Sequence, residues 1–400
     1  MKRRAFLKSS ALASTAMMVP AFLRANTGKS MLSSRSGRIL VVIQLSGGND
    51  GLNSIIPYQN DIYYRSRPSL GIKQEEVLKI SDELGFNPAL QGLQSLYDEG
   101  LLSIVNSVGY PNPDRSHFRS MDIWQTASSS TDYLSTGWIG RYLDNACQGC
   151  DKPYHALEVD DSLSLALKGQ RRNGFAAGDP VQLKKITDHR FLRAAGAHHH
   201  DHHDHAEEQV AYLYKTMIDT QASAEYLYQK AKVYKSRQTY PATPFGRDLK
   251  QVAELITADT DTQIYYLSLG GFDTHVNQKN QHARLLKQYA QGVKAFVADL
   301  KANNLLNDTL IMTFSEFGRR VKQNGSNGTD HGTANNLYLI GGQLRQPGFY
   351  NDAPNLKKLD QGDLIYQVDF RDIYANILDR WLNTDPKKVL DGKYGKMRLV

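Results

Sequence analysis

The chain has 400 residues, of which 40% are hydrophobic and 22% are charged, and it contains 31 glycines, 13 prolines and two cysteines. This composition is that of a globular protein held by its hydrophobic core, and it excludes a disordered, collagen-like or coiled-coil chain. The net charge of +7 comes mostly from five basic residues among the first 25, because the other 43 basic residues face 41 acidic ones. We therefore expect no nucleic-acid partner.

The first 25 residues predict an export signal. Lys2-Arg3-Arg4 precede a weakly apolar stretch over 9–23, and a small residue, Ala25, follows it. The arginine pair with Phe6-Leu7-Lys8 resembles a twin-arginine signal peptide over 1–25. We therefore expect the twin-arginine export machinery as a partner and a periplasmic or otherwise exported location. No later apolar run is long enough to span a bilayer, so the sequence predicts no integral membrane segment in the mature chain.

Apolar runs rich in β-branched residues predict strands that are buried on both faces. They lie at 38–45, 101–108, 263–269, 309–314 and 336–340. Residues 283–304 place apolar side chains at helical spacing between the third and fourth runs, and 370–382 predict a last helix. Strand, helix and strand in this order imply a mainly parallel sheet. The sequence thus predicts one α/β domain over 26–400, with a central sheet flanked by helices.

The middle of the chain, 151–260, has weaker strand signals and one long helical stretch at 207–235. We interpret it as an inserted helical region or cap on the sheet. Before that helix, 198–205 holds six histidines: His198, His199, His200, His202, His203 and His205. Such a run predicts a solvated loop that binds zinc, copper or nickel adventitiously, or has no function. Upstream, Cys147 and Cys150 form a C-x-x-C pair, for which a local disulfide or two idle thiols are expected.

Polar clusters follow the predicted strands where each one ends. They occupy 46–51, 270–275 and 315–320, and a fourth, 329–332, lies just ahead of the last strand. The carboxyl ends of parallel strands share one edge of a sheet, so these groups are expected to converge there. Their carboxylates and imidazoles suit zinc, manganese or calcium. The sequence therefore predicts a divalent metal site, the alternative being that the acids only cap helices.

A candidate nucleophile, Ser116, lies between the strand that ends near Val108 and a helical pattern over 119–126. A helix N-terminus favours bound anions, and a metal or a neighbouring base could activate the hydroxyl. A simple helix cap is the alternative for Ser116. His117 is open as a base, a ligand or a packed core histidine.

Six motifs in chain order resemble an exported bacterial family, domain of unknown function 1501. They are LSGGNDGLNSIIPY, DRSHFRSMDIWQTA, LGGFDTHVNQ, MTFSEFGRR, GTDHGTANNLYLIGG and VDFRDIYANIL. That family is similar to the alkaline phosphatase and sulfatase superfamily of metal-dependent hydrolases. The resemblance implies an alkaline-phosphatase-like fold and hydrolysis of a small-molecule or polymer-borne phosphate or sulfate ester.

The resemblance also implies roles for individual residues. Ser116 would be the nucleophile, with His117 and Arg115 as further catalytic candidates; Asp50, Asp273, His275, Glu316 and His331 would be metal ligands; and Asn49 and Arg319 would contact the substrate. The superfamily usually has an Asp-His pair where this chain has Glu316-Phe317, so the number of ions, one or two, stays open. Two other functions also stay open: a noncatalytic periplasmic binding or assembly protein with this fold, and a periplasmic metal buffer built on the histidine run.

Overall fold

The computed structural model describes residues 37–145, 147, 152–189, 205–395 and 397–400. The predicted signal peptide, Cys150 and the histidine run up to residue 204 lie outside the described residues. Within the described ranges, no helix has the length and apolarity needed to cross a membrane.

A central sheet organises the fold, in the order β11-β5-β10-β9-β1-β8-β6-β7, with β14 also paired to β5. Its strands are β1 (Ile39–Leu45), β5 (Leu102–Gly109), β6 (Ala156–Glu158), β7 (Phe175–Ala176), β8 (Ile264–Leu269), β9 (Thr309–Phe314), β10 (Asn335–Ile340), β11 (Gly348–Phe349) and β14 (Val368–Asp369). β1 pairs in parallel with both β8 and β9, and all five predicted strands are confirmed. β10 alone among the long strands is antiparallel to its neighbours, β5 and β9.

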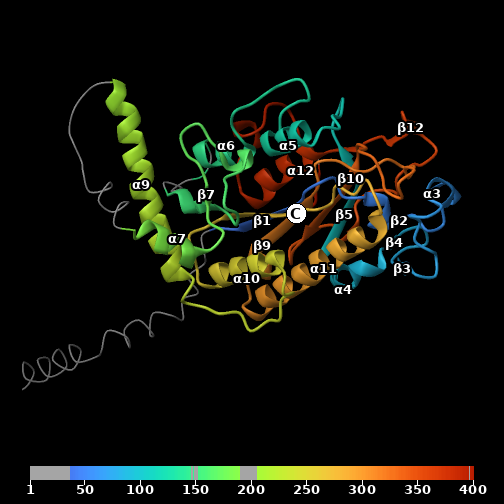
Figure 1. The fold of residues 1–400 in the computed structure, drawn as a ribbon, viewed down its shortest axis with the longest axis horizontal. Coiled ribbons are helices and arrows are strands. Elements are labelled where there is room, and N and C mark those ends of the chain that lie inside the picture. The colour runs from blue at the N-terminus through green and yellow to red at the C-terminus, as the bar shows by residue number, and fades with distance from the viewer. Residues whose placement is uncertain (1–36, 146, 148–151, 190–204, 396) are drawn as a thin grey trace, which may run out of the picture. The chain divides into compact units, whose positions relative to one another are not determined.

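Helices cover both faces of this sheet (Figure 1). One face packs against α4 (Gln91–Asp98), α10 (Pro244–Thr257) and α11 (Gln278–Ala302); the other packs against α5 (His117–Thr126), α6 (Trp138–Asn145) and α12 (Phe370–Asn376), which continues as a π-helix over Ile377–Trp381. Along β1, Val41 and Ile43 face the first layer, whereas Leu40 and Val42 face the second. The fold is therefore α/β, with a mainly parallel central sheet flanked by helices, as the sequence predicted.

The middle region extends the sheet as well as adding helices. β6 pairs in parallel with β8, and β7 continues the sheet beyond β6. The region also contributes α7 (Pro180–Thr187), α9 (His205–Lys230) and α10. Its strands are only two or three residues long, which is why their sequence signals are weak.

Two small sheets and one short helix supply further residues near the site. β2 (Ile55–Ile56), β3 (Leu78–Lys79) and β4 (Gly85–Phe86) form one sheet, α3 (Asp61–Ser66) lies between β2 and β3 in the chain, and β12 (Leu359–Asp360) pairs with β13 (Asp363–Leu364) in a hairpin. The reversal of β10 has a consequence for the long loop between β9 and β10. Because β10 begins where β9 ends, the whole loop over 315–334 lies at the carboxyl edge of the parallel strands.

Candidate metal centre

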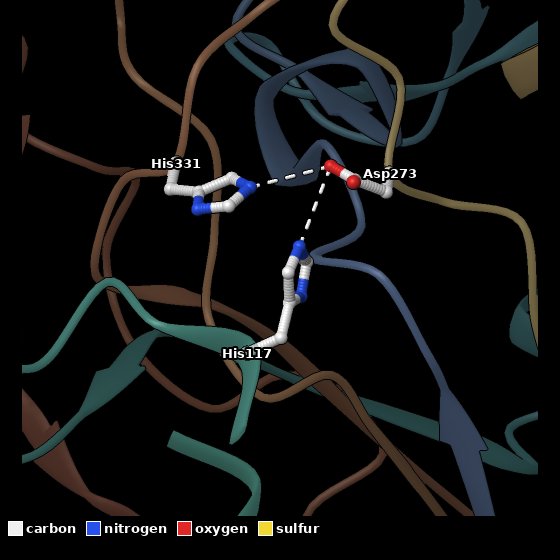
Figure 2. Close-up of side chains that lie close together, drawn as sticks. All are labelled: His117, Asp273 and His331. Carbon is white, nitrogen blue, oxygen red and sulfur yellow. Dashed lines mark hydrogen bonds and ion pairs between the residues drawn. The ribbon is translucent and has the colours of Figure 1, made fainter. Parts of the chain in front are cut away.

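Four side chains from three separate places in the chain meet at this edge. Asp273 and His275 follow β8, His331 lies in the loop before β10, and His117 is the first residue of α5. Figure 2 shows His117 and His331 pointing toward the carboxylate of Asp273. The predicted convergence of strand-end residues therefore occurs for these side chains.

The distances within this cluster match those between ligands of one ion. Asp273 Oδ1 lies 3.0 Å from His275 Nε2, 3.2 Å from His331 Nε2 and 3.4 Å from His117 Nε2. The Nε2 atoms of His275 and His331 are 2.9 Å apart. Zinc binds nitrogen and oxygen at about 2.0–2.2 Å, so two ligands in a tetrahedral arrangement lie roughly 3.3 Å from each other. The ligand atoms of His117, Asp273 and His331 all lie within 4.8 Å of one another, so one cation among these three would need only small side-chain movements, and His275 Nε2 lies beside two of them.

Each imidazole is fixed through its other nitrogen. The Nδ1 atom of His117 lies 2.9 Å from Glu316 Oε1, that of His275 lies 3.2 Å from Asp330 Oδ1, and that of His331 lies 2.7 Å from the carbonyl oxygen of Arg115. Since these three partners are acceptors, each Nδ1 carries the donating proton. The Nε2 of each neutral ring then presents a lone pair to the cluster, as in metal-binding histidines held by outer carboxylates and carbonyls.

The cluster contains polar atoms that the protein alone does not satisfy. His117 Nε2 is buried and has no hydrogen-bond partner among the described residues, although Asp273 Oδ1 lies 3.4 Å away. The facing lone pairs of His275 and His331 repel each other unless a proton or a cation lies between them. Leaving buried nitrogen atoms unpaired is costly, so this donor set fits a metal ion.

The electrostatics keep the carboxylate charged and one imidazole neutral. Burial alone would raise the pKa of Asp273, but the hydrogen bond and the charge of Arg319 lead the contacts that outweigh it and lower the pKa to about 2. Burial also lowers the pKa of His331, which favours its neutral, metal-binding form. The hydrogen bond to Glu316 raises the pKa of His117 in the protein without metal.

The family model described as Protein of unknown function (DUF1501) matches residues 103–400. The chain belongs to the DUF1501 family. A comparison of this DUF1501 protein with curated proteins gives no match.

Among the solved structures to which the DUF1501 protein is similar at low identity are the following three. Ps i-CgsB shares 11% identity, with 89% of this chain and 75% of that chain covered and a TM-score of 0.42. The C-terminal periplasmic domain of EcEptC from Escherichia coli shares 9%, with 91% and 92% covered and a TM-score of 0.39. Phosphonate monoester hydrolase SpPMH from Silicibacter pomeroyi shares 11%, with 90% and 75% covered and a TM-score of 0.39.

The candidate nucleophile of the DUF1501 protein directly precedes a histidine of the cluster in the chain. Ser116 is exposed at the N-terminal end of α5, next to His117, and its hydroxyl makes no capping hydrogen bond to the helix. Its backbone N–H donates to Asp114 Oδ1 at 2.6 Å, which holds the turn into α5. The cap that was the alternative for Ser116 is therefore not formed by its side chain.

Glu316, which was expected to be a metal ligand, lies behind His117. The residue is fully buried, and its Oε1 accepts the N–H of Gly47 at 2.7 Å as well as contacting His117 Nδ1. It thus supports a histidine of the cluster and does not itself join the group of facing ligand atoms. Phe317, the next residue, packs its ring against His117 and His331, with centroids 4.8 and 4.7 Å away.

Asp50 lies outside the cluster, in a buried ion pair. Its Oδ2 accepts hydrogen bonds from Arg67 Nη1 at 2.6 Å and from Gln278 Nε2, and its Oδ1 caps the turn at Asn53. Burial would raise the pKa of Asp50, but the charge of Arg67 leads a set of contacts that lower it overall. The role of Arg67 was not predicted, because this residue lies in a segment without an informative pattern.

Asn49 and Arg319 are also buried. Asn49 Oδ1 lies 2.9 Å from Nε2 of the buried His282. The Arg319 side chain is 0% exposed and donates to the carbonyl oxygens of Gly47, Gly48, Phe272 and Thr329 and, at 2.8 Å, to Asp273 Oδ1. The strand-end turns enclose Arg319 completely, and its contact with a substrate stays a prediction. Its role in this structure is to fix those turns and Asp273.

The remaining expectations concern residues away from the cluster. Cys147 is buried and disulfide-bonded, whereas Cys150 lies outside the described residues. Asp369 caps α12 by accepting the backbone N–H of Arg371 at 3.0 Å, and it also pairs with the Arg371 guanidinium. Sequence reasoning missed Asp330, although it directly precedes His331 and its carboxylate holds His275.

Proposed function

We propose that this DUF1501 protein is an exported metal-dependent hydrolase of phosphate or sulfate esters, with an alkaline-phosphatase-like fold. The observation that carries the proposal is the set of converging Nε2 and carboxylate atoms beside the exposed hydroxyl of Ser116. The ester class comes from the resemblance of the family motifs to the phosphatase and sulfatase superfamily. The export route is the twin-arginine pathway indicated by residues 1–25.

The proposed ligand set favours zinc and a single ion. Three imidazoles and one carboxylate, from His117, Asp273, His275 and His331, match zinc better than the oxygen-rich shells of calcium or manganese. The carboxylates that a second ion would need, those of Asp50 and Glu316, are already engaged by Arg67 and by His117 with the Gly47 N–H.

The residues of the chain would divide the work as follows. Zinc bound here would act as a Lewis acid, polarising an ester oxygen and lowering the pKa of a neighbouring hydroxyl. Ser116 would supply the attacking oxygen, and the first N–H groups of α5 would face the anionic group of the ester. Because the Nε2 atoms of both His117 and His331 face the cluster centre, we assign them as ligands and no longer as proton carriers.

The noncatalytic alternative has one observation in its favour. Phe317 occupies the position where superfamily hydrolases usually place a second imidazole, and its ring closes that side of the cluster. A one-ion site that binds a partner without turnover is consistent with this packing. The presence of the free Ser116 hydroxyl argues for the enzyme.

Metal analysis combined with an ester screen tests the proposal. Zinc content would be measured on untagged protein, on a variant lacking 198–205, and on that deletion variant carrying Asp273→Ala and His275→Ala. We expect near-stoichiometric zinc in the first two proteins and its loss in the third. Phosphate and sulfate ester hydrolysis by the zinc-loaded protein, absent in Ser116→Ala, would establish the enzyme. Zinc that disappears with residues 198–205 alone would favour the metal buffer, and bound zinc without turnover of any ester would favour the binding protein.

A further inference from the structure

An open hollow of about 390 Å³ borders the candidate metal centre. Its lining residues are Arg115, His275, Arg320, Asp330, His331 and Gln361. Two of these are histidines of the cluster, so a molecule in the hollow reaches the metal centre directly. The other notable feature is a pair of arginines, which come from the turn before α5 and from the loop between β9 and β10.

Both arginines are held by one buried carboxylate. Arg115 Nε donates to Asp363 Oδ2 at 2.8 Å, with Nη2 of the same side chain on that oxygen, and Arg320 Nε donates to Asp363 Oδ1 at 3.2 Å. The side chain of Asp363 is 1% exposed, whereas those of Arg115 and Arg320 are 40% and 39% exposed. The guanidinium groups of Arg115 and Arg320 therefore share the single buried carboxylate of Asp363, and both arginine side chains are partly exposed to solvent.

The guanidinium groups keep donors for a further partner. Arg320 Nη2 donates to the carbonyl oxygen of Gln361, so each arginine is fixed through Nε and Nη2. The Nη1 group of each has no hydrogen-bond partner among the residues that the structure describes. The carboxylate of Asp330 also lines the hollow, where it accepts from Asn324 at 3.0 Å, contacts His275 and interacts with the charge of Arg320 without a hydrogen bond to it.

A tight hairpin supplies the anchor. Asp363 begins β13, directly after a two-residue turn between β12 and β13 in which Gln361 and Gly362 have φ of 51° and 91°. Positive φ at both turn positions is the conformation of a type I′ hairpin, which fixes the position of the residues that follow. The anchor is thus rigid before any ligand binds, which reduces the cost of ordering the two arginines.

We propose that this hollow binds a tetrahedral oxyanion, the phosphate or sulfate group of the substrate or product, through Arg115 and Arg320 held by Asp363. The inference rests on the proposed function for the identity of the substrate, but the anion site itself follows from the two arginines. Planar guanidinium groups match the oxygens of phosphate and sulfate in two-point contacts. In this proposal Arg320 has the substrate-contacting role that was expected of its neighbour Arg319.

Titration calorimetry with inorganic phosphate and, separately, sulfate tests the proposal on the full-length zinc-loaded protein. The variants are Arg320→Gln, Arg320→Lys and, as a matched control, Arg284→Gln, which removes an exposed arginine of α11. A charge-assisted hydrogen bond corresponds to roughly a 10- to 100-fold change in affinity. We expect Arg320→Gln to weaken oxyanion binding about tenfold or more, Arg320→Lys to weaken it less, and Arg284→Gln to leave it within twofold. The stronger ligand of the two identifies the source of the anion.

Zinc content and the urea unfolding midpoint would be measured for each variant, to show that fold and metal are intact. Equal oxyanion affinity in wild type and Arg320→Gln, or no binding by wild type, would overturn this inference. Such a result together with ester hydrolysis would leave the proposed function standing. Conversely, binding that depends on Arg320 without hydrolysis would keep the oxyanion site and reject the enzyme.

Discussion

Replacing Glu316 by glutamine tests whether this residue supports His117 or is itself a ligand. Glu316 is fully buried and lies 2.9 Å from His117 Nδ1. A buried hydrogen bond to a charged acceptor contributes about 1.5–3 kcal/mol, and the loss of such a partner lowers the metal affinity of a histidine site about 10- to 100-fold. The two magnitudes agree, because 1.4 kcal/mol corresponds to tenfold. Glutamine keeps the shape and one acceptor oxygen for both donors, His117 and the Gly47 N–H, but it removes the negative charge that strengthens these hydrogen bonds.

Zinc affinity would be measured by competition with a chelator at pH 7.5, in wild type, Glu316→Gln and His117→Ala. We expect Glu316→Gln to bind zinc 10- to 100-fold more weakly and His117→Ala to lose more, since it removes a ligand atom. Exposed Glu83→Gln is the control and should match wild type. An unchanged affinity in Glu316→Gln would refute the supporting role. A loss as large as that of His117→Ala would make Glu316 a direct ligand.

Three other variants test separate parts of the structure. Ser116→Ala should abolish ester hydrolysis while zinc content and the unfolding free energy stay unchanged, because the hydroxyl makes no capping bond; residual turnover would exclude it as the nucleophile. Gly48 has φ of 74°, and an added Cβ would lie 2.3 Å from the Phe317 ring, so Gly48→Ala should destabilise the protein by about 1–3 kcal/mol in urea unfolding. Gly325→Ala, where a Cβ meets nothing within 4 Å, is its control, and equal stability of the two would contradict this account. Burial raises the pKa of Glu158 from 4.5 to about 7, so ionisation costs the folded state stability as pH rises through this range. Wild type should therefore lose up to about 3 kcal/mol between pH 4.5 and 8 through this group, and Glu158→Gln should flatten the profile; parallel profiles would count against the shift.

The strands and the edge where the site forms were predictable because they depend on local patterns. Continuous apolar runs predict strands buried on both faces, and the polar residues that follow them must lie where the strands end. That reasoning brought Asp273, His275 and His331 together correctly. It could not give the direction of β10, because an apolar run reads the same in a parallel and an antiparallel strand.

The roles of individual side chains were less predictable, because they depend on partners that are distant in sequence. Asp50 has the position of a ligand, but two residues from elsewhere in the chain engage it: Arg67 forms an ion pair with it, and Gln278 donates a hydrogen bond to it. Arg319 and Arg320 are neighbours that the sequence does not distinguish. The path of the loop buries the side chain of Arg319 and leaves that of Arg320 partly exposed. His117 was left open for the same reason, since its burial depends on Glu316 and Phe317.

The loop between β9 and β10 is closed upon itself by backbone pairing. Arg319 and His331 form an antiparallel bridge, and the N–H of Arg320 donates to the carbonyl oxygen of Asp330 at 3.0 Å. His331, the proposed zinc ligand, and Arg320, the proposed anion-binding residue, therefore lie on two neighbouring pairs of one short antiparallel ladder. A shift that improves the fit of one must displace the other, so selection on this loop cannot tune the affinities for metal and for anion separately. Substrate preference in this chain is then easier to change in the β12–β13 hairpin, which contacts the arginines through their side chains.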